Sequence, residues 1–113
     1  MAGSAGRHRT YSPYTLDAVR LLGEQVRLGR RQRRWTQAEL AERGGVGVRT
    51  LSRVEHGDPR VSVGVAFELA ALVGVPLFHA DHERLAMDLE RTRARSTVLP
   101  QRIRSTAEPD DDF

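Results

Sequence analysis

The chain has 113 residues, of which 39% are hydrophobic and 29% charged, so it can form one small domain but not two independent ones. It has no cysteine, which excludes disulfide scaffolds, thiolate metal sites and cysteine nucleophiles. No apolar run approaches the roughly 20 residues that cross a bilayer, and residues 1–15 contain no hydrophobic signal core. The sequence therefore predicts a soluble, cytoplasmic protein with no membrane association.

The charge is unevenly distributed along the chain. All 18 basic residues are arginine, and with 15 acidic residues the net charge is +3. Residues 1–60 carry a net charge of +6 and residues 61–113 a net charge of −3. A polyanion would be attracted to the first half only. A run of charged residues is often only a solvated surface. The motifs are therefore needed to distinguish a polyanion-binding surface from an ordinary solvated one.

The spacing of apolar residues predicts an all-α fold. Residues 1–13 have little apolar content and are expected to form a disordered arm. Apolar residues then recur at helical spacing, with Gly or Pro at most of the breaks between segments. Residues 97–99 allow a short strand as an alternative, and residues 105–113 are expected to form a disordered acidic tail. Helices are expected over residues 16–34, 37–43, 48–56, 62–73 and about 76–95.

The second and third expected helices have the pattern of a helix-turn-helix. Thr36 and Glu39 form a capping box that opens the second helix. Ala41 supplies the small residue needed where the two helices cross, and Gly45 permits a positive φ in the turn. The core contacts of the pair are expected from Leu40, Val46, Leu51 and Val54.

Residues 22–78 resemble the Xre/Cro/C1 family of repressor domains, most specifically in the stretches TQAELA, RTLSRVEHG and ELAALVGVPL. The resemblance implies a five-helix, lambda-repressor-like fold with flexible tails, in which residues 14–78 form the helix-turn-helix DNA-binding domain. Residues 79–104 would then supply a C-terminal helix and a dimer or partner segment.

The resemblance also implies roles for individual residues. The start and the next turn of the third helix would contact bases through Gly47, Val48, Arg49 and Arg53. Phosphates would be bound by Gln37, His56 and Arg60, to which we add the hydroxyl-bearing Thr36 and Thr50. Arg30 and Glu55 would form a structural ion pair.

The chemistry of the third helix agrees with these roles. Arg49 and Arg53 are four residues apart and share one helix face, whereas Leu51 and Val54 occupy another. An arginine fork matches the O6 and N7 atoms of guanine, and Val48 offers methyl groups suited to the thymine methyl. The alternative for both arginines is ordinary solvated helix surface.

Two glycines depart from the family pattern. Gly47 is a weaker helix cap than the usual Ser or Thr. Gly44 stands where the family usually buries a branched apolar residue. We therefore expect a looser turn, partly offset by packing of Trp35, which we place in the core and not in a base stack.

No enzyme activity, cofactor or metal site is expected. His79 and His82 are three residues apart but have no third clustered ligand. Ser52 and His56 share a helix face, but no orienting carboxylate or oxyanion site accompanies them.

The expected partner is double-stranded DNA with a near-palindromic operator, bound by a homodimer whose helices enter successive major grooves about 34 Å apart. The dimer interface is expected at Leu77, Phe78, Leu85 and Leu89, although the fifth helix could instead pack against its own domain. Residues 98–104 are similar to the tails of HipB-type antitoxins, which implies a HipA-like kinase toxin as a further partner. A stand-alone repressor and a protein-interaction domain that has lost DNA binding are the alternatives.

Overall fold

The computed structural model of the protein describes residues 9–100. These residues contain five α-helices and no β-strand, which confirms the expected all-α fold. The chain divides into two compact units, Met1–Leu77 and Phe78–Phe113. The first unit contains α2 (Pro13–Gln32), α3 (Gln37–Gly44), α4 (Val48–Glu55) and α5 (Val63–Leu72), and the second contains α6 (His82–Val98).

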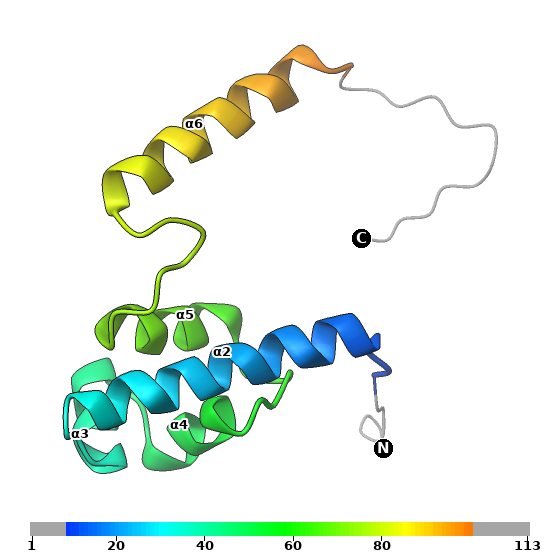
Figure 1. Ribbon diagram of the computed structural model, residues 1–113. Coiled ribbons are helices and arrows are strands. Elements are labelled where there is room, and N and C mark those ends of the chain that lie inside the picture. Colours follow the sequence, from blue (N-terminus) through cyan, green and yellow to red (C-terminus); the bar gives the residue numbers. More distant parts are fainter. Residues whose placement is uncertain (1–8, 101–113) are drawn as a thin grey trace. The chain divides into compact units, whose positions relative to one another are not determined.

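The core of the first unit lies where α2 and α3 each pack against α4 and α5 (Figure 1). All four helices contribute buried apolar side chains, as the helical spacing predicts. Burying each Val or Leu side chain contributes about 1.5–3 kcal/mol, so this cluster is the main source of stability. The largest side chains that are fully buried are Val26, Leu40, Leu51 and Leu69.

Two glycines allow α2 to approach its neighbours closely. A Cβ atom at Gly23 would collide with the backbone carbonyl oxygen of Val54, near the end of α4. A Cβ atom at Gly29 would lie 2.8 Å from the Cβ atom of Val73, just after α5. Contacts this close leave no room for a side chain at either glycine, so they fix α2 against α4 and against the residue that follows α5.

The first helix begins earlier and ends earlier than the apolar pattern predicts. It begins at Pro13 because Ser12 caps it: the Ser12 hydroxyl accepts the Thr15 N–H at 3.2 Å. Part of the expected disordered arm is therefore ordered, while residues 1–8 lie outside the described residues. The helix ends at Gln32, and Arg34, expected as its last residue, has a φ of +60°.

The last described helix, α6, begins at His82 and not near Pro76. The chain at Phe78 has a φ of +71°, which no helix accommodates. Asp81 then caps the helix, because its carboxylate accepts the Arg84 N–H at 2.8 Å. The helix continues to Val98, so the alternative of a strand over residues 97–99 is wrong. The expected tail over residues 105–113 lies outside the described residues.

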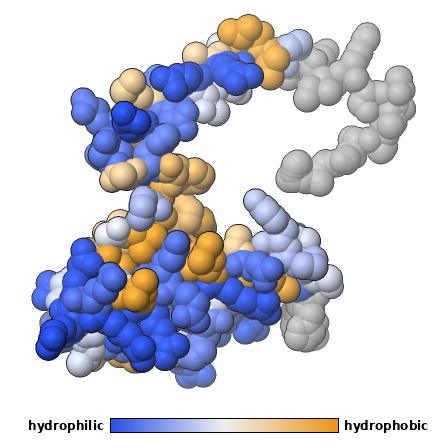
Figure 2. Space-filling model, in the orientation of Figure 1, coloured by the Kyte–Doolittle hydropathy of each residue, from blue (hydrophilic) through white to orange (hydrophobic). Residues whose placement is uncertain are grey.

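Hydrophilic residues (blue) cover most of the visible surface of the first unit, with hydrophobic residues (orange) between them (Figure 2). The exposed hydrophobic residues of α2 include Leu21 and Leu28. Within residues 9–100, none of the helices has the length and apolar character needed to cross a membrane.

Candidate nucleic-acid interface

The turn between α3 and α4 follows the expected geometry. The Thr36 hydroxyl accepts the Glu39 N–H at 3.1 Å, and the Glu39 carboxylate accepts the Thr36 N–H at 2.7 Å, which confirms the capping box. Gly45 ends α3 with a φ of +68°, as predicted. Gly47 begins α4 with no side-chain hydrogen bond, so α4 has the weaker cap expected from the sequence.

The turn is packed at Gly44, where the sequence predicts looseness. A Cβ atom on Gly44 would lie 2.8 Å from Cδ2 of Leu69, so the Leu69 side chain already fills that space. Trp35 packs against the core as expected, and the guanidinium carbon of Arg43 lies 4.1 Å from its ring centroid. This arrangement covers one face of the indole with a cation, and so it favours a structural role for Trp35.

The exposed face of α4 carries Val48, Arg49 and Arg53, with Ser52 half-buried on the helix and the exposed His56 directly after it. The Val48 residue is 45% exposed, the Arg53 side chain is 53% exposed, and Arg49 is also exposed. Leu51 and Val54 on the opposite side are buried. The helix therefore presents two arginines and a branched apolar side chain to solvent while its other face is held in the core.

A buried carboxylate anchors the end of α4. The Glu55 side chain is only 2% exposed and accepts two hydrogen bonds from Arg30, from Nε at 2.7 Å and from Nη2 at 3.1 Å. The Gln37 amide donates a third at 3.1 Å. Arg30 Nη1 also donates to the backbone oxygen of Trp35 at 3.0 Å. Three helices, α2, α3 and α4, thus meet at one carboxylate, and Arg30 also links it to the loop before α3.

Within the expected phosphate-binding set, Gln37 is already engaged inside the protein through Glu55. Thr36 is the exposed cap of α3, and Thr50 is half-buried on α4. His56 ends α4, with Nδ1 2.7 Å from the Ser52 carbonyl oxygen. Because a carbonyl oxygen only accepts, Nδ1 carries the proton in this contact.

Sequence reasoning missed Asp58, which follows α4 and holds Arg60. The Asp58 carboxylate accepts hydrogen bonds from Arg60 Nε at 3.0 Å, from Arg60 Nη2 at 3.1 Å and from the Arg60 N–H at 2.9 Å. Arg53 Nε lies 3.6 Å from the same carboxylate. The side-chain and backbone hydrogen bonds from Arg60 hold the pKa of Asp58 below its usual value. An Asp two residues before an Arg, just after a helix, is a turn signal that could have revealed this contact.

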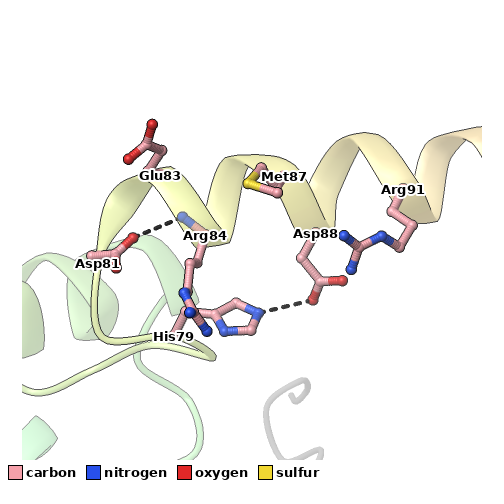
Figure 3. A pocket seen from close by; sticks show the side chains of 7 residues that line it. All are labelled: His79, Asp81, Glu83, Arg84, Met87, Asp88 and Arg91. Atoms are coloured by element: carbon pink, nitrogen blue, oxygen red, sulfur yellow. Dashed lines mark hydrogen bonds and ion pairs between the residues drawn. The ribbon is translucent and has the colours of Figure 1, made fainter.

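The second unit has a separate pocket along α6, lined mainly by charged residues (Figure 3). Within it, His79 Nε2 lies 3.2 Å from Oδ2 of Asp88. Across residues 9–100 there is no group of three or more His, Asp or Glu side chains that could hold a metal ion. His82, the other histidine considered for a metal site, is the first residue of α6.

One family of known proteins matches part of the chain. A family model described as Helix-turn-helix (HTH_3) matches residues 26–79, which run from the second half of α2 through α5 and slightly beyond. The match agrees with the helix-turn-helix that α3 and α4 form in this segment. It also supports a DNA-binding transcription regulator of the Xre type. No curated protein matched the chain significantly.

Proposed function

We propose that the protein is a sequence-specific repressor that inserts the exposed face of α4 into the major groove of DNA. The observation that carries the proposal is the exposure of Arg49 and Arg53 on a helix anchored through Glu55. A preorganised helix loses little conformational entropy on binding. The guanidinium groups of its two exposed arginines can form bidentate hydrogen bonds with base edges. We propose that this regulator is cytoplasmic.

We propose the residue roles that the sequence led us to expect. The base contacts are Gly47, Val48, Arg49 and Arg53, at the start of α4 and on its next turn. The phosphate contacts are Thr36, Gln37, Thr50, His56 and Arg60, which flank α4 in the chain or lie on it. Gln37 has a double role, because one of its amide hydrogens positions Glu55 while the other groups of the amide can contact a phosphate.

We also propose that the active form is a dimer on a near-palindromic operator. Residues 14–78 bind DNA, and residues 79–104 supply the dimer or partner segment. Support comes from α6, which has no buried residue and carries Leu85 and Leu89 four positions apart on one face. The interface we propose consists of Leu77, Phe78, Leu85 and Leu89.

DNA binding at several salt concentrations tests the proposal. A protein that neutralises several phosphates releases counterions, so its affinity for duplex DNA falls steeply as salt rises. We expect this steep fall for the full chain. Affinity that is absent, or that is insensitive to salt, would contradict the proposal and favour a protein-interaction domain.

A second function, that of an antitoxin which binds a HipA-like kinase toxin, is favoured by the end of α6. Val98 and Leu99, at the end of α6, are 82% and 64% exposed, and neighbouring exposed apolar side chains suit a segment that docks on a partner. Co-purification of the chain with the product of a neighbouring gene tests this function. Recovery of a kinase supports it, whereas recovery of the regulator alone favours a stand-alone repressor.

A further inference from the structure

We propose that Asp58 sets the DNA affinity of this domain by competing with DNA phosphates for Arg60 and Arg53. The inference rests on the proposed function, because it takes Arg60 as a phosphate contact and Arg53 as a base contact. Asp58 then acts on DNA binding through these two arginines and needs no contact of its own with DNA.

The contact between Asp58 and Arg60 occupies the part of the guanidinium that fits an anion best. Nε and Nη2 lie along one edge of the group, and they donate to Oδ1 and Oδ2 at 3.0 and 3.1 Å. A phosphate presents two oxygens in a similar geometry, so it would use the same two donors. A phosphate that binds Arg60 in this way must therefore displace the carboxylate.

The carboxylate is fixed while the arginines are open to solvent. The Asp58 side chain is 13% exposed, against 53% for Arg53 and 71% for Arg60. Oδ1 also accepts the Arg60 N–H at 2.9 Å, and the Asp58 N–H donates to the Arg53 carbonyl oxygen at 3.0 Å. These bonds hold the negative charge beside the end of α4. The lowered pKa of Asp58 agrees with a carboxylate that stays ionised at neutral pH.

The Asp58 carboxylate weakens DNA binding in two ways. It occupies the Arg60 donors, and its charge offsets the attraction that both arginines exert on the DNA backbone. An exposed ion pair is a weak competitor, so removal of the charge should tighten binding by about two- to fivefold. The dependence of affinity on salt should steepen by up to about one phosphate contact, because Arg60 becomes fully available.

Asp58→Asn is the variant that tests this inference. Asparagine keeps a side-chain oxygen for the Arg60 N–H, so the turn is preserved while the charge is lost. Glu68→Gln is the matched control, because Glu68 is exposed on α5 and its substitution changes the net charge by the same amount. Affinity is measured by fluorescence anisotropy over a series of KCl concentrations, with a mixed-sequence duplex of roughly 30 base pairs, long enough for two successive major grooves.

We expect tighter binding and a steeper salt dependence for Asp58→Asn than for Glu68→Gln. In an Arg60→Ala background the gain from Asp58→Asn should shrink, because the group released by the substitution is gone. Binding by Asp58→Asn that equals or falls below that of the wild type would overturn the inference. Equal gains from both charge removals would also overturn it. Wild-type protein that shows no salt-dependent DNA binding would refute the proposed function itself.

Discussion

Arg30 holds the carboxylate of Glu55 with two of its nitrogens, at 2.7 and 3.1 Å, and so ties the last turn of α2 to the last turn of α4. Both side chains are shielded from water, at 11% and 2% exposure. The partners therefore depend on each other, because either charge left alone would be desolvated without compensation. The Arg30–Glu55 pair therefore contributes to the stability of the domain and also fixes the position of α4, the helix that we propose to bind DNA.

Arg30→Ala should destabilise the first unit by about 3–5 kcal/mol, because it leaves the Glu55 carboxylate buried with Gln37 as its remaining side-chain donor. Urea denaturation followed by circular dichroism measures this loss. The control is Asp17→Ala, which breaks an ion pair with Arg20 whose side chains are 79% and 62% exposed. That change should cost less than about 1 kcal/mol. Equal losses from the two variants would show that the buried pair has no special role.

Gly23→Ala should destabilise the protein by roughly 3 kcal/mol or more. The Cβ atom of the alanine would overlap the carbonyl oxygen of Val54 and push α2 away from α4. Gly64→Ala provides the contrast. Nothing lies within 4 Å of a Cβ at this position of α5. Alanine should there stabilise the helix by up to about 1 kcal/mol. Thermal melts of the two variants should shift in opposite directions, and shifts in the same direction would argue against the close approach of α2.

Arg49→Ala and Arg53→Ala should each weaken operator binding by about 1–3 kcal/mol and relax the base preference at one position. Neither side chain is in the core, so both variants should unfold at nearly the wild-type urea concentration. Arg93→Ala on α6 serves as the control for the loss of one positive charge, because its side chain is 66% exposed outside the helix-turn-helix. Normal operator binding by both α4 variants would mean that the base contacts are assigned to the wrong helix face.

The lowered pKa of Asp58 predicts a pH dependence of stability. Its folded pKa lies below the ordinary value of 3.8, so the ionised carboxylate stabilises the fold fully above that value. The contribution is lost as the pH falls below 3.8 toward the folded pKa. Urea midpoints of the wild type and of Asp58→Asn should therefore converge as the pH falls from about 6 to about 2.5. A difference that stays constant over this interval would contradict the assignment.

Local signals in the sequence account for most of the fold. The start of α3 follows from Thr36 and Glu39, whose reciprocal hydrogen bonds are both present. The start of α2 carried a signal of the same kind in Ser12 and Pro13, which the apolar spacing alone does not include. The start of α6 could not be placed from apolar residues, because the left-handed conformation at Phe78 interrupts a segment that looks periodic.

The contacts of the candidate site were harder to predict. The packing of Leu69 against Gly44 joins α5 to α3 and has no local signature in the chain. The same holds for Gln37, whose bond to Glu55 spans 18 residues and depends on how the helices pack. A family pattern supplied the Arg30–Glu55 pairing, whereas the contact between Asp58 and Arg60 had only a local turn signal, an Asp two residues before an Arg just after a helix.

Selection of bound sequences from a random pool of duplex DNA is the decisive experiment on whether α4 of this protein reads DNA bases. We expect enrichment of two inverted half-sites. Their centres should be separated by one helical turn of about 10 base pairs, or by a multiple of it. We also expect that Arg49→Ala and Arg53→Ala each lose preference at one position of the half-site. A pool that stays random after repeated rounds, or that yields the same motif with both arginines replaced, would contradict the account.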